Sequence, residues 1–384
     1  MTSEACLNYF ANATEDMLAT LEMLAAIDSP SGDVDAISRF VIVYGPLLER
    51  AGLVVREIPG PSGPHVFAEA PWAGQDGPPI VLVGHTDTVW PVGETLRRPP
   101  RRESGRLYGP GVCDMRAGLT LIAHALRYLR DSGFQSPRPI QVFLSADEEL
   151  GSTTAHPHME ELLRSDATAI VLEPPLEDGS LKTRRKGVGM YKILATGVEA
   201  HAGLEPERGA SAVTEIVRAV LDVLSWADPK RGITLNVGQI RGGIATNVVA
   251  GQAEAGLDVR FESLKDGEAI HERLQSLPVH DQRTSLRVEG GIIFPPLVPT
   301  PASERLARIA IGIANELGLR ISTGMAGGGS DGSFLAARGL TVLDGAGVEG
   351  GGAHARDEHV RMDRVPVRAA LLSLLLEALA EGRD

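Results

Sequence analysis

The stretch Ile80-Val81-Leu82-Val83-Gly84-His85-Thr86-Asp87 decides how this chain is built, because it joins a short apolar run to a histidine and an acid. Two later stretches repeat the pattern: Ser145-Ala146-Asp147-Glu148-Glu149 follows an apolar run at 140–144, and Glu173 follows one at 169–172. Apolar runs without alternation are typical of strands buried on both faces of a mostly parallel sheet. Because open α/β sheets build their sites at the carboxyl ends of such strands, we expect an α/β domain with its site there.

Helical spacing of apolar residues predicts the elements that cover this sheet. Met17, Leu21 and Leu24 share one face of a first helix, and Ser29-Pro30-Ser31-Gly32 ends it. By the same criteria, the expected helices are residues 17–25, 37–52, 119–129, 306–317 and 365–380, and the further strands are residues 53–55, 66–70, 319–321 and 340–343.

The pattern changes from about Gly187 onward, where strands begin to alternate apolar and polar residues. The expected order is strand, helix, strand, strand, helix, strand, which is that of the ferredoxin-like split unit. Clean alternation indicates a sheet with one covered face and one solvated face. We therefore expect residues 192–291 to form an inserted α+β domain, with residues 1–191 and 292–384 forming the discontinuous α/β domain around it.

Composition excludes several classes of protein. Hydrophobic residues make up 43% and charged residues 23% of the 384 residues, as in ordinary globular domains. The net charge of −13 disfavours nucleic-acid binding, and no apolar run reaches the ~18 residues of a membrane span. No basic segment followed by an apolar stretch is visible at the start, and two cysteines cannot form a disulfide framework. We therefore expect a cytoplasmic protein.

Five residues are candidate metal ligands: His85, Asp114, Glu149, Glu173 and His354. Two imidazoles and three carboxylates suit zinc, which accepts nitrogen and carboxylate ligands. Two cations that share one carboxylate would lie ~3.5–4 Å apart. Asp114 lies in a glycine-rich turn before the expected helix at 119–129, so it could offer one oxygen to each ion.

Two further acids have candidate roles beside these ligands. Asp87 follows His85 by two residues, where it can accept a hydrogen bond from the other ring nitrogen and so set the tautomer. Glu148 and Glu149 are adjacent carboxylates that repel one another unless a cation offsets their charge. One of them would bind metal, and the other would take a proton from a water whose pKa the metal lowers to ~7.

Each of these residues also has an ordinary interpretation when it is taken alone. A single acid at a strand end is more often a cap or a solvated loop residue, and a lone histidine is more often structural. Cys113 is interpreted as a packing residue, since no paired base accompanies it.

The ordered set of motifs resembles one family. His85-Thr86-Asp87, the blocks 111–118 and 147–152, Glu173-Pro174 and Ala353-His354 are similar, in that order, to the motifs of the di-zinc metallopeptidases. That family is typified by glutamate carboxypeptidase, which is the branch that this chain resembles most. Aminoacylase, acetylornithine deacetylase and succinyl-diaminopimelate desuccinylase are relatives. The resemblance covers nearly the whole chain.

The resemblance implies two zinc ions per chain, with cobalt or manganese as alternatives. It implies that Asp114 bridges the ions, that His85 and Glu173 complete one site, and that Glu149 and His354 complete the other. Glu148 would then be the general acid and base, and Asp87 would orient His85. The implied fold is a zinc-peptidase-like catalytic domain with an inserted ferredoxin-like lid, through which a homodimer forms.

The resemblance also implies residues that contact the substrate. His201 resembles the lid histidine that helps to hold the oxyanion. Asn247 and Arg260 resemble residues that bind the substrate's terminal carboxylate, a role that suits the fork of an arginine. The remaining candidates are Lys186 at the first hinge and Gly328 and Gly329 in the glycine turn at 327–331. The chain departs from the family pattern at two places. Glu289-Gly290-Gly291 stands where an arginine is expected near the second hinge, and Met115 stands where many relatives have a second acid after Asp114.

The expected function is zinc-dependent hydrolysis of a peptide or amide bond next to a free carboxylate, with a small peptide or an N-acyl amino acid as substrate. A deacylase of N-acyl amino acids is the alternative within hydrolases. A nucleotide-dependent oxidoreductase is suggested by the glycines at 345–350, but residues 351–357 lack the helical period that such a site needs. A non-catalytic binding protein would require a lost ligand or base, and none is lost.

Overall fold

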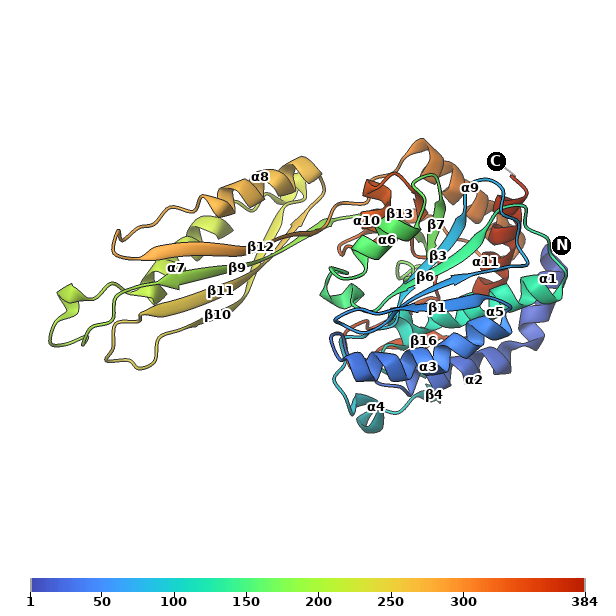
Figure 1. Ribbon diagram of the computed structural model, residues 1–384, viewed down its shortest axis with the longest axis horizontal. Coiled ribbons are helices and arrows are strands. Elements are labelled where there is room, and N and C mark those ends of the chain that lie inside the picture. The colour runs from blue at the N-terminus through green and yellow to red at the C-terminus, as the bar shows by residue number, and fades with distance from the viewer. Residues whose placement is uncertain (1, 383–384) are drawn as a thin grey trace. The chain divides into compact units, whose positions relative to one another are not determined.

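The computed structural model describes residues 2–382, which divide into two compact units (Figure 1). The first unit contains the described residues up to Arg184, Val298–Ala326, and those from Ser330 onward. The second unit contains Arg185–Leu297 and Gly327–Gly329. The second unit is longer at both ends than the expected range 192–291. Its first strand, Gly187–Thr196, begins before residue 192, and its last strand, Ser285–Phe294, ends after residue 291.

The first unit is built on a six-stranded sheet with the order β1-β2-β6-β3-β7-β14. The strands β6, β3, β7 and β14 run parallel to one another, whereas β2 pairs antiparallel with both β1 and β6. The predicted α/β fold with a mostly parallel sheet is therefore confirmed. The strand bounds are β1 Val54–Ile58, β2 His65–Glu69, β3 Ile80–His85, β6 Ile140–Ser145, β7 Thr168–Val171 and β14 Thr341–Leu343.

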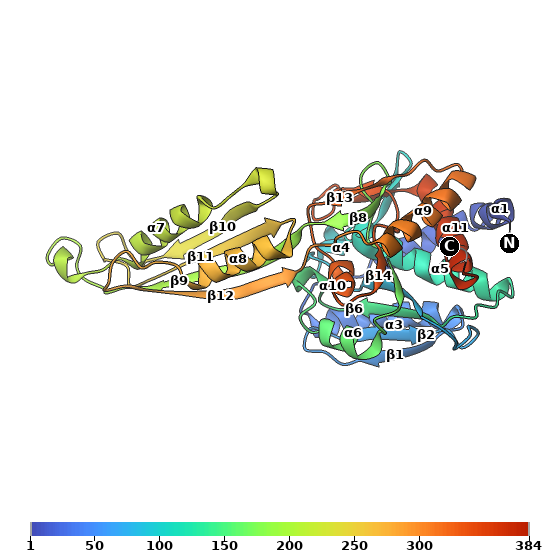
Figure 2. The same ribbon diagram turned by 90° about the horizontal axis from the view of Figure 1, so that it is seen from above.

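Helices cover both faces of this sheet (Figures 1 and 2). Gly118 of α5 lies so close to Leu172 that a Cβ atom there would clash with it, and Gly332 of α10 likewise lies close to Val171. Because neighbouring residues of an extended segment point to opposite faces, α5 and α10 pack on opposite faces of the sheet. Every position of β3 and β6 is accordingly buried. The helix bounds are α1 Ser3–Asn12, α2 Thr14–Ala25, α3 Val34–Arg50, α4 Glu94–Arg97, α5 Ala117–Asp131, α6 His156–Leu162, α9 Pro301–Glu316, α10 Asp331–Ala337 and α11 Val365–Ala380.

The last helix, α11, is apolar on all sides except at Arg368, Ser373 and Glu377, and it lies inside the first unit. It packs against α1, α5 and α9, and its residues from Val367 to Ala380 are all buried. A helix that is hydrophobic on all sides is stable only where other elements surround it. No helix within residues 2–382 combines the length and the apolarity that a bilayer crossing requires.

One predicted strand is wrong. Residues 319–321 were expected to be a strand, but they form an irregular segment after α9, and β13 begins only at Thr323. Leu319 is buried in the hydrophobic core and Ile321 packs against it, so their apolar character reflects core packing rather than strand pairing. The strand β13, Thr323–Ala326, pairs with β8, Leu181–Arg185.

A small four-stranded sheet in the first unit carries a hairpin that matters for the site. Its order is β15-β16-β5-β4, and β15 and β16 pair antiparallel on either side of residues 352–358. The strand bounds are β4 Arg101–Glu103, β5 Arg106–Tyr108, β15 Gly350–Gly351 and β16 His359–Arg361.

The second unit has the expected β-α-β-β-α-β order and an antiparallel sheet with the order β10-β11-β9-β12. The two helices and one face of the sheet share a single hydrophobic core, so burial alternates along β11. The bounds are β9 Gly187–Thr196, α7 Ala212–Leu224, β10 Thr234–Gly242, β11 Gln252–Phe261, α8 Leu264–Gln275 and β12 Ser285–Phe294.

Candidate metal centre

Five segments that are distant in sequence bring the expected ligands to one end of the first unit's sheet. His85 ends β3, Glu149 lies in a single turn after β6, and Glu173 follows β7. Parallel strands end at the same edge, which is why these three side chains meet. Asp114 lies in the turn Val112–Arg116 that leads into α5. His354 lies in the β15–β16 hairpin with a φ of 61°, a left-handed conformation that is uncommon outside glycine.

Asp114 lies between the two imidazoles. Its Oδ1 is 3.1 Å from His85 Nε2, and its Oδ2 is 3.4 Å from His354 Nε2. His85 Nε2 is also 3.3 Å from Glu173 Oε1, and His354 Nε2 is 3.0 Å from Glu149 Oε2. The arrangement therefore contains two clusters that share the Asp114 carboxylate.

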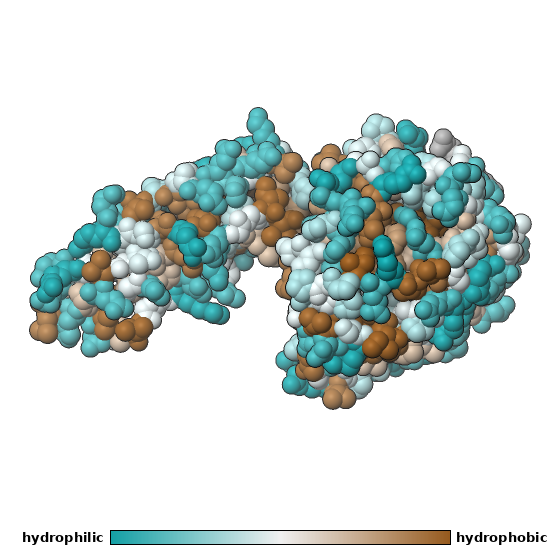
Figure 3. Space-filling model, viewed as in Figure 1, coloured by the Kyte–Doolittle hydropathy of each residue, from teal (hydrophilic) through white to brown (hydrophobic). Residues whose placement is uncertain are grey.

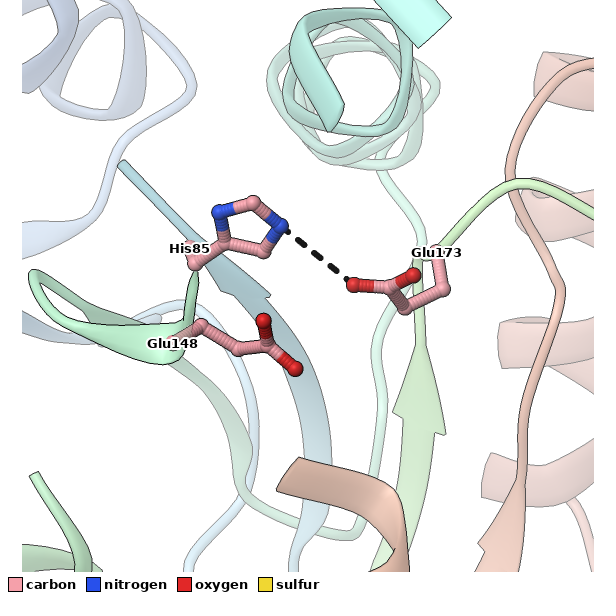
Figure 4. Close-up of side chains that lie close together, drawn as sticks. All are labelled: His85, Glu148 and Glu173. Atoms are coloured by element: carbon pink, nitrogen blue, oxygen red, sulfur yellow. Dashed lines mark ion pairs between the residues drawn. The ribbon is translucent and has the colours of Figure 1, made fainter. Parts of the chain in front are cut away.

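The donor atoms of these clusters converge closely enough to hold a metal ion. The ligand atoms of His85, Glu148 and Glu173 lie within 4.8 Å of one another, and so do those of His85, Asp114 and Glu149. Figure 4 shows the Glu148 carboxylate directed toward the space between the His85 ring and Glu173. Imidazole nitrogen and carboxylate oxygen are the donors of catalytic zinc sites, so the residues present fit divalent cations of that kind.

Burial and crowding perturb the acids of the site. Burial, together with the charge of Glu173, raises the pKa of Glu148 well above its usual value. Burial also raises the pKa of Glu149 to about 7, although the His354 contact opposes it. Burial would raise the pKa of Asp114 too, but its bonds to His354 and His85 outweigh burial and lower that pKa well below its usual range.

The two imidazoles respond in the opposite sense. Contacts with Asp114 and Glu149 raise the pKa of His354 to about 10. Burial lowers the pKa of His85, but the neighbouring carboxylates outweigh it and the net shift is upward. Protonated imidazoles thus offset the acids in the metal-free protein. Metal ligands must be deprotonated, so metal binding at this centre would release protons and would strengthen as the pH rises.

Asp87 connects two parts of the site. It is fully buried, and its Oδ1 lies 3.3 Å from His85 Nδ1, which also lies 3.1 Å from the Asp87 backbone oxygen. The backbone N–H groups of Glu148 and Glu149 each donate to the Asp87 carboxylate over 3.2 Å, and the Ser31 hydroxyl donates over 2.7 Å. The same carboxylate therefore contacts the His85 ring and the turn that carries both glutamates.

Asp331 contacts the residues that flank that turn, a role that was not predicted from the sequence. The hydroxyls of Ser145 and Ser152, which lie before and after the two glutamates, both donate to the buried Asp331 carboxylate. His156 Nε2 lies 3.3 Å from Asp331 Oδ1 and its ring stacks on Phe334. The only local signal is the Ser330-Asp331 pair at the start of α10, which is typical of a helix cap.

We expect Asp331→Asn to lower the free energy of unfolding at pH 7 by about 1–3 kcal/mol, because it disrupts hydrogen bonds of a buried carboxylate. Burial raises the pKa of Asp331, but its contacts with His156, Ser145 and Ser152 outweigh burial and the net shift is downward. Its stabilisation is therefore present above the unfolded carboxyl pKa of ~3.9 and is lost as the pH falls.

Urea unfolding of the wild type and the Asp331→Asn variant at pH 7 and below pH 4 measures this effect. The difference between the two proteins should shrink at the lower pH. Asp166→Asn is the control, since Asp166 is an exposed acid paired with Arg164. Equal losses in the two variants at pH 7 would contradict the role of Asp331.

The expected substrate residues all belong to the second unit. His201 is exposed, and its Nδ1 accepts hydrogen bonds from the backbone of Gly203 and Leu204 over 3.1 Å each. The Ala202 N–H donates to the Asn247 carbonyl over 3.0 Å, so the loops that carry His201 and Asn247 lie side by side. Within this unit, the structure therefore brings these two candidates together.

The cationic candidates have partners of their own. Arg260 forms two bonds to Asp258, of 2.8 and 2.7 Å, through Nε and Nη2. Lys186 Nζ donates to the Gly232 carbonyl over 3.0 Å and lies 3.7 Å from Glu262. The carbonyls of Gly328 and Gly329 accept from Arg185 Nη1 over 3.2 and 3.0 Å.

Both the sequence and the fold have counterparts among known proteins. The sequence model of Peptidase family M20/M25/M40 matches residues 81–378. Carboxypeptidase G2 of Pseudomonas sp. (strain RS-16) is 26% identical over 97% of this chain and 92% of that protein. A succinyl-diaminopimelate desuccinylase of Methylococcus capsulatus is 30% identical over 79% of this chain and 84% of that protein. A crystal structure of a tripeptidase from Staphylococcus aureus superposes with a TM-score of 0.78 at 22% identity, covering 96% of this chain and 99% of that chain.

Proposed function

This chain belongs to Peptidase family M20/M25/M40 and is a metallohydrolase, and from this premise we propose that it cleaves an amide bond next to a free carboxylate as a glutamate carboxypeptidase-like exopeptidase. The observation that carries the proposal is the position of Asp114 between His85 and His354, with Glu148 directed toward the space between His85 and Glu173. The relative named carboxypeptidase, which matches nearly the whole chain, supports this choice.

Two divalent cations, zinc in the first place, are part of the proposal. His85 and Glu173 would hold one, Glu149 and His354 the other, and Asp114 both, as the paired contacts suggest. When bound, the ions would polarise the scissile carbonyl and lower the pKa of the attacking water.

Glu148 moves the proton in this proposal. Its carboxylate accepts a proton from the attacking water and passes it to the leaving nitrogen, as a general base and then a general acid. Burial raises its pKa, which makes the carboxylate a stronger base and so favours the first of these transfers. Asp87 supports the reaction by holding the Glu148 backbone and the His85 ring in place.

The second unit would bind the substrate. We assign the oxyanion to His201 and the free carboxylate to Asn247 and Arg260, with Lys186, Gly328 and Gly329 as further contacts. Asp258 already binds the Arg260 guanidinium through Nε and Nη2, which orients it. A guanidinium held in one orientation can present its remaining N–H groups to a carboxylate at a lower entropic cost.

A homodimer formed through the second unit belongs to the same proposal. Val217, Leu221 and Leu224 are exposed on one side of α7, and Ile240 is exposed on the edge strand β10. Figure 3 shows apolar patches that interrupt the hydrophilic surface of this unit. Exposed apolar patches of this kind are typical of protein interfaces. A cytoplasmic location is also proposed, since the described residues contain two free, buried cysteines and no disulfide.

An assay panel tests the reaction class. N-acyl glutamates, dipeptides and N-acetylornithine are compared, with and without a chelator, and activity is restored with zinc, cobalt or manganese. Fastest release of a C-terminal amino acid would support the exopeptidase. A preference for small acyl groups would favour the N-acyl-amino-acid deacylase instead, an alternative that the desuccinylase relative supports. Activity that survives complete metal removal would contradict both.

We expect Arg260→Ala to raise KM by about ten-fold to a hundred-fold for substrates with a free carboxylate, because a charge-assisted hydrogen bond is worth ~1.5–3 kcal/mol. The esterified analogue of the same substrate should show little change. Steady-state kinetics on both substrates measure the difference. Arg218→Ala, at an exposed position of α7, is the control. Equal effects on the acid and the ester would remove Arg260 from this role.

A further inference from the structure

Glu358 is a buried acid outside the ligand set described above. Only 1% of its surface is exposed, and it lies in the β15–β16 hairpin immediately before β16. Its carboxylate accepts hydrogen bonds from four N–H groups, three of the backbone and one of a tryptophan. Burying a carboxylate is costly, so a carboxylate with this many partners indicates a specific role.

Both oxygens of Glu358 contact the turn that carries Asp114. Oε1 accepts from the backbone N–H groups of Cys113 over 3.0 Å and Asp114 over 3.1 Å. Oε2 accepts from the Gly111 N–H over 2.8 Å and from Trp90 Nε1 over 2.9 Å. Hydrogen bonds to an ionised acceptor are roughly twice as strong as neutral ones, so this turn is held firmly.

The orientation of that turn decides how Asp114 can act. Asp114 directs one oxygen at His85 and the other at His354, and a rotation of its backbone would break at least one of these contacts. Glu358 follows His354 by four residues in the same hairpin. One hairpin therefore supplies both the candidate ligand His354 and the Glu358 carboxylate, which accepts hydrogen bonds from the backbone of the turn that carries Asp114.

We infer that Glu358 is a positioning residue that holds the backbone of Asp114 so that its carboxylate can face two metal ions. This inference rests on the proposed function, because it assumes that Asp114 binds metal. Glu358 itself is not among the proposed ligands. Outer residues that orient metal ligands typically change metal affinity by about ten-fold to a hundred-fold when they are replaced.

Glu358→Gln is the principal test. The variant replaces one acceptor oxygen by an NH₂ group, which would face a pair of N–H donors and lose their bonds. Zinc titration of the metal-free protein against a competing chelator measures affinity and stoichiometry, and thermal unfolding of the metal-free protein measures stability. We expect zinc affinity to fall by about ten-fold or more at both sites, because they share Asp114.

Glu349→Gln is the matched control. Glu349 is also a buried glutamate, and it pairs with the buried Arg368 over 2.9 Å. It should lower the thermal stability of the metal-free protein without changing the zinc affinity of the folded protein. A Glu358 variant that behaved in the same way would have a purely structural role, and this result would overturn the inference.

Glu358→Asp covers the case in which the glutamine variant does not fold. It retains the charge but is shorter by one methylene, so it cannot reach all four donors, and its zinc affinity should lie between those of the wild type and the glutamine variant. Wild-type zinc affinity in either folded variant contradicts the positioning role. Failure of the wild type itself to bind zinc would instead contradict the proposed function, so the two failures are distinguishable.

Discussion

Glu148→Gln is expected to abolish turnover while the metal content stays close to that of the wild type. The amide is similar in size to the carboxylate but cannot accept a proton from water at neutral pH. General acid and base catalysis is worth about 10²–10⁴-fold, and Glu148 is proposed to act in both transfers. The measurements are kcat for the best substrate and metal analysis of the purified variant.

The controls for this experiment separate the proton transfer from the metal. Glu161→Gln, at an exposed position of α6, should retain full activity. If Glu148→Gln also lost its metal, then Glu148 would be a ligand rather than the proton carrier, a possibility raised by the closeness of its carboxylate to His85 and Glu173. Turnover within ten-fold of the wild type would remove Glu148 from the mechanism.

Asp114→Asn should have the largest effect on metal binding, because both clusters share this carboxylate. The amide carries no charge and has one oxygen instead of two, so it cannot serve two cations. We expect metal occupancy to fall at both sites, and the stabilisation that metal supplies should be lost with it, since metal binding is coupled to folding. Metal analysis and thermal unfolding measure the two effects.

Chelation provides an internal control for Asp114→Asn. Removing metal from the wild type should lower its unfolding temperature, whereas the variant should change little on the same treatment. A variant that held as much metal as the wild type, with the same response to the chelator, would show that Asp114 is not shared between two ions.

Much of the first unit could be predicted from local sequence. Residues 80–83, 140–144 and 169–172 are apolar at every or nearly every position, and such runs form strands in a sheet that is covered on both sides. The helix predicted at 365–380 coincides with α11, because its apolar residues need a buried environment. The incorrect strand at 319–321 shows the limit of this reasoning, since short apolar runs also pack into a core without pairing.

The candidate ligands could be predicted for the same local reason. Acids and histidines directly after buried strands must emerge at the edge where parallel strands end, so His85, Glu149 and Glu173 were expected to meet. Asp114 and His354 were candidates by residue type alone, and the resemblance of motifs assigned each to a site, since neither follows a strand of the main sheet. Their place in the centre depends on a turn before α5 and on a hairpin in a separate small sheet.

Local sequence patterns predicted the α/β class, the ferredoxin-like order of the second unit, and the residue types that gather at the strand ends, because these follow from periodicity and from neighbours along the chain. The folded structure was needed to show that Ser145 and Ser152 donate hydrogen bonds to Asp331 and that Glu358 accepts one from the backbone of Asp114. The physical reason is distance along the chain. Hydrogen bonds between segments 179 to 244 residues apart depend on how whole elements pack, and no local pattern records which buried acid will face which backbone N–H.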